Sequence, residues 1–110
     1  MKPSTRQLKS IEKLNAELQA FAKETGEEVA TLYEDIYTSY TLSDIKLKGD
    51  RLSYVYDGKR ETELLIDEDD LKEWLKFWRA CLKRAKRYWA TDSETLDAIA
   101  DGEKEDIEIE

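Results

Sequence analysis

The chain has 110 residues, a formal net charge of −8 at pH 7, and 40% hydrophobic residues that include three Trp, six Tyr and two Phe. This apolar and aromatic content argues against a disordered chain, and the length is that of one domain with a single modest core. An acidic chain also resists nonspecific binding to nucleic acid or to an anionic membrane, unless its positive charge is gathered in one place.

The residue types that support most catalytic chemistry are scarce. The chain has no His and a single Cys, Cys81, so the commonest general base, the usual zinc ligands and an intramolecular disulfide are all missing. The sequence also lacks a Walker-type loop, a dinucleotide fingerprint and a nucleophile elbow. We therefore expect no enzymatic activity, no cofactor and no metal site.

We interpret Cys81 as a small buried apolar residue in a reducing compartment. No segment approaches the length of a membrane span, and the N-terminal residues lead into a polar helix without an apolar stretch. We therefore expect a cytoplasmic protein with no membrane partner.

The N-terminal segment has the pattern of an amphipathic helix. Ser4 or Thr5 can cap its start, with Gln7 three residues after Ser4 as in a capping box, and Gly26 is suited to end it. The apolar residues that recur at helical spacing are Leu8, Ile11, Leu14, Leu18, Phe21 and Ala22.

A second helix is predicted directly after Gly26. Apolar and aromatic residues between positions 29 and 40 fall at i, i+3, i+4, i+7, i+8 and i+11, which makes a one-sided helical stripe. We expect this helix to pack against the first one. The stripe consists of Val29, Leu32, Tyr33, Ile36, Tyr37 and Tyr40.

The junction of these two predicted helices resembles the spacing of a helix-turn-helix motif, with Ala22, Gly26 and Leu32 at the matching positions. The segment that would enter a DNA groove carries acidic residues, and no Lys or Arg occurs between Lys23 and Lys46. Because phosphates would repel such a segment, we interpret the junction as ordinary helix pairing around a glycine.

A three-stranded meander is predicted after residue 44. Residues of alternating character form three short runs, and the dipeptides Gly49-Asp50 and Asp57-Gly58 are suited to the two turns between them. The alternating residues are Ile45 and Leu47 in the first run, Leu52, Tyr54 and Tyr56 in the second, and Thr62, Leu64 and Ile66 in the third.

A long amphipathic helix is predicted from Glu68 to Trp89, with Asp67 as its N-cap, and a short helical turn through Leu96 and Ile99 can follow. Its predicted core face consists of Leu71, Trp74, Leu75, Trp78, Leu82, Ala85 and Trp89.

The predicted fold class is therefore α+β: two N-terminal helices, a three-stranded antiparallel β-meander, a long C-terminal amphipathic helix and an acidic tail. Residues 1–102 are predicted to form a single domain, and residues 103–110 an acidic tail that we expect to be flexible.

Charge is sorted into three blocks along the C-terminal half. An acidic run, 67–70, is followed by seven cations from Lys72 to Arg87 against Glu73 alone, and then by nine carboxylates from Asp92 onward against Lys104 alone. Six of the cations share an arc of about 100° on a helical wheel and form the candidate binding face. These residues are Lys72, Lys76, Arg79, Lys83, Lys86 and Arg87.

This basic face has several interpretations. It can be the solvated side of a core helix, because acids before a helix and bases in its last turns are favoured by the macrodipole. It can also bind phosphates, an acidic partner or a membrane surface, although the three tryptophans fit a core better than a lipid surface. The acidic tail can solubilise the protein, fold back and screen the basic face, or imitate nucleic-acid phosphates.

The tail also approaches a calcium-binding loop. Asp97, Asp101, Gly102 and Glu108 occupy positions 1, 5, 6 and 12 of the EF-hand pattern, but Ile99 replaces an oxygen ligand at the third position. We interpret the match as chance in an acidic segment.

These patterns lead us to expect a small acidic intracellular interaction or regulatory protein, of the size and composition of bacterial or phage accessory proteins. Its partner is expected to be another protein, bound through charged surfaces, and a homodimer is compatible with the sequence. The alternative is a nucleic-acid-binding module that uses the basic face and is screened by its acidic tail.

Overall fold

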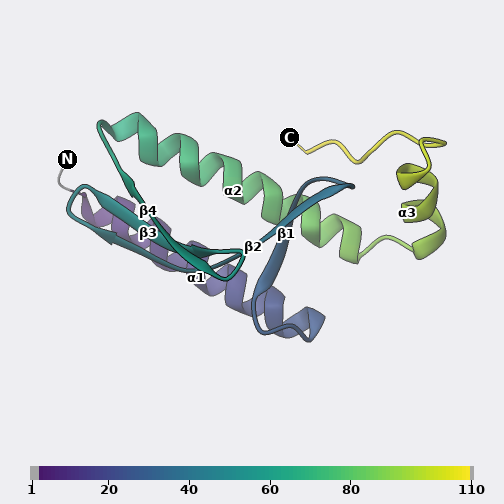
Figure 1. The fold of residues 1–110 in the computed structure, drawn as a ribbon, viewed down its shortest axis with the longest axis horizontal. Helices are drawn as coiled ribbons and strands as arrows, with labels where there is room; N and C mark the ends of the chain where they lie inside the picture. Colours follow the sequence, from purple (N-terminus) through teal and green to yellow (C-terminus); the bar gives the residue numbers. More distant parts are fainter. Residues whose placement is uncertain (1–2, 110) are drawn as a thin grey trace.

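The computed structural model describes residues 3–109 (Figure 1). It confirms the α+β class, with one helix, then a four-stranded antiparallel sheet, then two helices. Two details of the prediction are wrong, because a single helix precedes the sheet and the sheet has four strands. Glu110, the end of the predicted tail, lies outside the described residues. The elements are α1 (Thr5–Thr25), β1 (Ala30–Asp35), β2 (Thr38–Lys48), β3 (Arg51–Tyr56), β4 (Lys59–Leu64), α2 (Glu68–Trp89) and α3 (Ser93–Ala100).

Helix α1 is the helix that the N-terminal pattern predicts. The Ser4 side chain accepts a hydrogen bond from the Gln7 amide at 3.1 Å, and the Gln7 side chain accepts one from the Ser4 amide at 2.8 Å. Gly26 ends the helix with φ of +77°, a left-handed conformation that glycine adopts without strain. Of the six predicted core residues five are buried, whereas Leu8 is 40% exposed.

The predicted second helix is wrong. Residues 30–35 form β1, residues 38–48 form β2, and a two-residue turn joins them, in which the Asp35 side chain accepts a hydrogen bond from the Tyr37 amide at 2.8 Å. The helical spacing misled because the residues that enter the two strands include Thr31, Tyr33, Thr38 and Tyr40, which are β-branched and aromatic types that fit a pleated sheet better than a helix. The Asp35 side chain stabilises the turn between β1 and β2, which the helical spacing did not predict.

The sheet has the strand order β1-β2-β3-β4, and every neighbouring pair is antiparallel. The predicted turns at Gly49-Asp50 and Asp57-Gly58 are confirmed. Both Asp57 and Gly58 have positive φ, 48° and 82°, which is the geometry of a two-residue hairpin whose twist matches the strands. The predicted meander thus corresponds to the second half of β2 and to β3 and β4.

Strand β2 is irregular in its middle, and this irregularity anchors α1. The pairing of β2 with β3 shifts register between Ser43 and Lys46, and Asp44 there has φ of +49°. The freed backbone groups of Ile45 are bonded by Asn15 of α1, which donates to the Ile45 carbonyl at 2.8 Å and accepts from its amide at 2.9 Å. A polar residue on the helix therefore completes the hydrogen bonding of the bulge.

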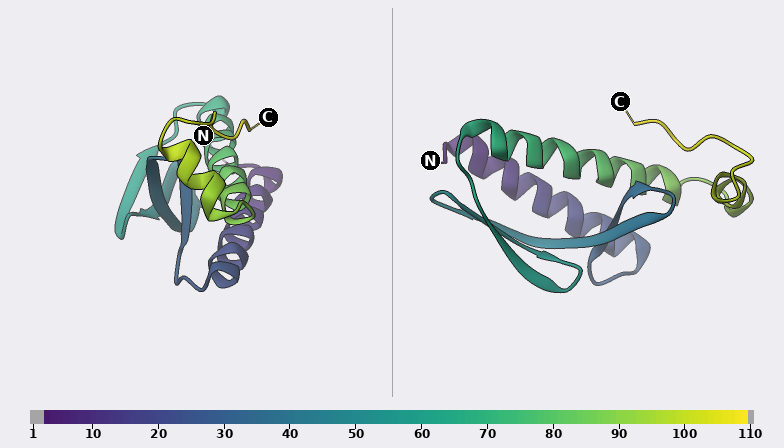
Figure 2. Two further views of the ribbon diagram at one scale, coloured as in Figure 1. Left: turned by 90° about the vertical axis from the view of Figure 1, so that its right-hand side faces the viewer. Right: turned by 45° about the horizontal axis from the view of Figure 1, so that its top comes forward.

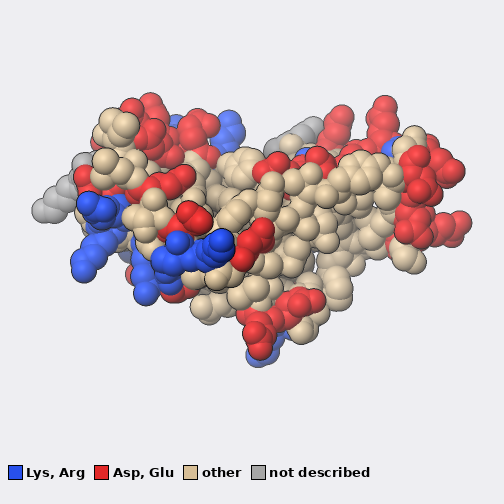
Figure 3. Space-filling view, viewed as in Figure 1, with Lys and Arg blue, Asp and Glu red and all other residues tan. Residues whose placement is uncertain are grey.

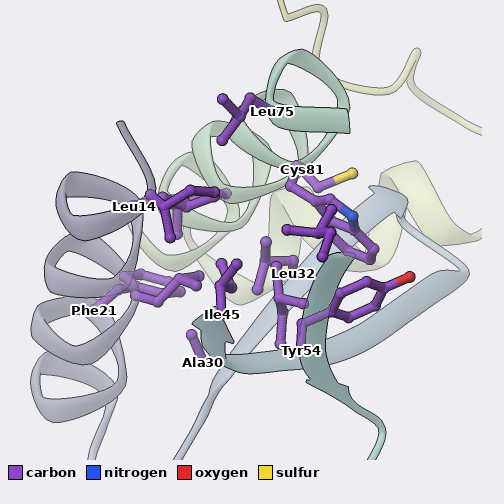
Figure 4. Close-up of a cluster of buried hydrophobic side chains, with 14 of the residues drawn as sticks. Leu14, Phe21, Ala30, Leu32, Ile45, Tyr54, Leu75 and Cys81 are labelled. Atoms are coloured by element: carbon purple, nitrogen blue, oxygen red, sulfur yellow. The ribbon is translucent and has the colours of Figure 1, made fainter. Parts of the chain in front are cut away.

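Helices α1 and α2 lie side by side on one face of the sheet (Figure 2), and they run in the same direction, so their N-terminal ends lie together (Figure 1). The core fills the space between the two helices and the sheet (Figure 4). Leu14 and Phe21 enter it from α1, Leu32 and Tyr54 from the strands, and Leu75 from α2.

Helix α2 begins and ends where predicted, and Asp67 caps it by accepting from the Asp69 and Asp70 amides at 2.9 and 3.2 Å. One predicted core residue is wrong: Trp89 is 55% exposed, and Tyr88 is buried instead. The Tyr88 ring meets Tyr33 of β1 edge-on with centroids 5.1 Å apart. Helix α3 lies beyond the end of α2, and the chain then returns alongside α2 (Figure 1).

Candidate binding groove

The six residues of the candidate binding face all lie exposed on α2. Four of them, from Lys72 to Lys83, line one groove between α2 and the start of α1, and the other two lie farther toward the end of the helix. The structure thus brings most of the predicted face together at a hollow in the surface. The groove residues among them are Lys72, Lys76, Arg79 and Lys83.

The groove has a volume of about 810 Å³ and combines cationic walls with an apolar lining. Two carboxylates, Glu68 and Asp69, lie at the end where α2 begins. The five cations of the walls are Arg6, Lys72, Lys76, Arg79 and Lys83. The apolar lining comes from Leu71, Leu75, Ala80 and Ile109.

Three cations of α1 belong to the same basic region and were missed by the sequence analysis. Arg6 lines the groove, and Arg6, Lys9 and Lys13 together border a shallower depression beside it. These residues fall at i, i+3 and i+7, so the signal was present in the sequence. It was overlooked because α1 also carries acidic residues, and only the packing of α1 beside α2 joins the two basic surfaces.

The cations in the middle of the groove are not neutralised within the described chain. Among residues 3–109 no carboxylate lies within 4.0 Å of the charged groups of Lys72, Lys76 or Arg79. Figure 3 shows that the end of the molecule where α3 lies carries mostly carboxylates, whereas the opposite end carries Lys and Arg side chains together with further carboxylates. The groove therefore presents positive charge on a molecule that is negative as a whole.

The segment after α3 contacts α2 at several points. The Asp106 carboxylate accepts hydrogen bonds from the Tyr88 hydroxyl at 2.5 Å and from the Ile36 amide at 3.1 Å, and it lies 3.8 Å from the Arg84 guanidinium. Arg84 also donates to the Ile107 carbonyl at 2.5 Å. Arg87, a residue of the candidate binding face, donates to the Glu108 carbonyl at 2.9 Å. The end of this segment, Ile109, reaches the groove.

These contacts shift the acidity of the residues that make them. Burial by itself would raise the pKa of Asp106, but the hydrogen bonds from Tyr88 and from the amides of Ile107 and Ile36, together with the Arg84 charge, lower it below 3.8. Burial raises the pKa of Tyr88 to about 12, and the hydrogen bond to Asp106 adds to this shift. The pair is thus held as a charged carboxylate and a neutral hydroxyl.

Other chemically suggestive residues do not assemble into a second site. Within residues 3–109 there is no group of three or more Asp, Glu, Cys or His side chains placed to hold a metal ion. Cys81 is buried, and burial raises its pKa to about 11, so the thiol stays protonated at neutral pH. The segment that would be the recognition helix of a helix-turn-helix is strand β1 and the start of β2.

Across the described part of the chain, the helices fall short of the length and apolarity needed to cross a membrane. Comparison of the chain with known proteins found no matching family model, no similar curated protein and no similar solved structure.

Proposed function

We propose that the protein is a non-enzymatic, cytoplasmic interaction protein that binds an acidic segment of another protein in the groove between α1 and α2. In this proposal the basic face of α2 is the main contact surface and α1 completes it. Regulation of the bound protein is the role we expect, because the described lining of the groove consists of cations, two carboxylates, uncharged polar residues and apolar side chains.

The observation that carries the proposal is the pairing of cations with an apolar lining in one groove. Five cations stand against two carboxylates around a surface formed in part by Leu75 and Ala80. A ligand that satisfies both features carries carboxylates and apolar side chains together, as an acidic protein segment does.

Nucleic acid is the second candidate, and the extension of the basic surface onto α1 favours it. Lys9 and Lys13 lie beside the groove and would add phosphate contacts. Two features make it the weaker candidate. Glu68 and Asp69 at one end would repel phosphates, and among residues 3–109 no aromatic ring lines the groove to stack on a base.

The test compares two labelled probes on the full chain by fluorescence anisotropy. One probe is a peptide in which glutamate alternates with leucine and the other is a 20-nucleotide DNA strand, each measured at low and near-physiological salt. The variant is Lys76→Gln/Arg79→Gln, and its matched control is Lys48→Gln/Lys59→Gln, which removes two exposed cations from the sheet.

We expect the acidic peptide to bind the wild-type chain and the control alike, and to lose about tenfold in affinity with the groove variant, since the variant removes two exposed charge contacts of up to about 1 kcal/mol each. Stronger binding of DNA, with a steep salt dependence lost in the groove variant, would favour the nucleic-acid candidate. Equal loss in groove variant and control would show that the groove is not the binding surface.

A further inference from the structure

We infer that the C-terminal segment Asp106–Ile109 covers the part of the binding surface next to the groove, with Ile109 at the groove itself, and that the partner it competes with is an extended segment in which carboxylates alternate with branched apolar residues. This inference rests on the proposed function and adds the partner's chemistry and the segment that competes with the partner.

The first observation is that the segment is fastened beside the groove by buried and half-buried groups. Tyr88 is only 5% exposed, and its hydroxyl donates to Asp106. The Ile36 amide, in the turn between β1 and β2, donates to the same carboxylate. One acidic side chain therefore joins the tail to both the sheet and α2, which is more than a solvated acidic appendage requires.

The second observation is how the basic residues hold the segment. Arg84 and Arg87 bind the backbone carbonyls of Ile107 and Glu108, so they recognise an extended chain as well as a charge. Main-chain recognition of this kind accepts many sequences, whereas the side chains that reach pockets select among them. A segment of another protein could make the same two contacts.

The third observation is the place of Ile109. Ile107 and Ile109 are both half-buried in the described structure, and Ile109 lines the groove together with Leu75 and Ala80. Between and before the isoleucines stand Glu108 and Asp106, so the tail has the alternation of acidic and apolar residues that the groove's own surface matches. Of residues 106–109 only Ile109 lines the groove, so the rest of the groove, including the part at Arg6, is left to a longer ligand.

The segment Asp106–Ile109 competes with a free partner because it is covalently tethered to α3. The segment begins only a few residues after α3, and a tethered ligand experiences an effective concentration of the order of millimolar. A free partner must displace it, so its apparent affinity is reduced by the fraction of time in which the groove is open.

The experiment uses a labelled, capped peptide that copies residues 103–110, Glu-Lys-Glu-Asp-Ile-Glu-Ile-Glu, added to the full chain. Its affinity is compared between the wild-type chain and the unlatched variant Asp106→Ala/Ile109→Ser. This variant removes the hydrogen bonds of Asp106 with Tyr88 and Ile36, which we call the latch, and the apolar contact of Ile109 with the groove. The matched control is Glu105→Gln, which changes the charge of the same tail at an exposed residue. A second peptide with both isoleucines replaced by serine tests the apolar requirement.

We expect the unlatched variant to bind the peptide about tenfold more tightly than the wild-type chain, which corresponds to a groove that is closed about nine-tenths of the time. The control should match the wild type, and the serine peptide should bind more weakly than the isoleucine peptide. In the wild-type chain, saturating peptide should also speed hydrogen exchange at the Ile36 amide, because that amide loses its partner when the tail leaves.

Equal affinity of the peptide for the wild-type and unlatched chains, with unchanged exchange at Ile36, would overturn the inference and leave the proposed function intact. Equal binding of the serine and isoleucine peptides would overturn the partner chemistry. Absence of binding to every chain, including the unlatched one, would overturn the proposed function itself.

Discussion

Replacing Asp106 with alanine should destabilise the protein measurably, although the residue lies outside the helices and strands. The carboxylate joins α2 to the β1–β2 turn through the Tyr88 hydroxyl at 2.5 Å and the Ile36 amide at 3.1 Å. In Asp106→Ala both donors lose their partner, and the Tyr88 hydroxyl belongs to a residue that is 5% exposed.

The magnitude follows from these two bonds, because the third hydrogen bond to the carboxylate, from the Ile107 amide at 2.7 Å, lies within the tail itself. A hydrogen bond to a charged group contributes about 1.5–3 kcal/mol, so two of them set an upper limit of about 3–6 kcal/mol. The loss should be smaller, because the tail can detach locally and allow water to reach both donors. The Arg84 contact adds little, because its charged groups are 3.8 Å apart and the Asp106 side chain is 29% exposed. We expect a loss of about 1–3 kcal/mol in the free energy of unfolding.

The assay is urea denaturation at neutral pH, followed by tryptophan fluorescence, with Glu105→Ala as the control. Glu105 is exposed and makes no hydrogen bond or ion pair with residues 3–109, so its replacement should change the free energy of unfolding by less than about 0.5 kcal/mol. If Asp106→Ala is no more destabilised than Glu105→Ala, the reasoning about the latch is refuted.

Three further predictions concern stability. Leu14→Ala should lower the free energy of unfolding by about 2–5 kcal/mol and Leu8→Ala by less than about 1 kcal/mol, since Leu14 is 0% and Leu8 40% exposed; similar losses in urea denaturation would contradict the assigned core. Asn15→Leu should lower it by about 1–3 kcal/mol because both backbone groups of Ile45 lose their partner, and a neutral effect in the same assay would show that the bulge does not depend on α1. The stabilisation by Asp106 should be fully present above pH 3.8, where the carboxylate is charged in the folded and the unfolded state, and should disappear as the pH falls through the lowered pKa of the folded state. A difference in unfolding free energy between the wild type and Asp106→Ala that persists unchanged in strong acid would contradict this pH dependence.

The sequence was sufficient for those elements whose ends are marked by local chemistry. The Ser4 capping box and Gly26 mark the two ends of α1, Asp67 marks the start of α2, and Asp57-Gly58 marks a hairpin, and all of these predictions are confirmed. Such signals act over four or five residues, so they do not depend on the rest of the fold.

The segment from residue 27 to 40 could not be assigned from spacing alone. Its apolar residues recur with a helical period. In the structure, however, β1 packs against α2 and pairs with β2, and the turn at Asp35 and Tyr37 forms between these two paired strands. Tertiary pairing therefore overrode local periodicity, as it often does for segments rich in β-branched and aromatic residues.

The binding groove was predictable in part. The cations of α2 could be placed on one face from their spacing, but their neighbours on α1 and the position of Ile109 depend on contacts between distant parts of the chain. The exposure of Trp89 has a similar origin, because it lies at the end of α2, where Tyr88 makes the contact with β1.

The most direct test of the groove as a binding site is a titration of the isotopically labelled full chain with the capped 103–110 peptide, followed by amide NMR shifts. We predict that the largest shifts map to Arg6, Leu75 and Arg79, which line the groove, with a smaller set at Ile36 as the tail is displaced. Shifts confined to residues of the sheet such as Ser53, or no shifts at millimolar peptide, would contradict the account.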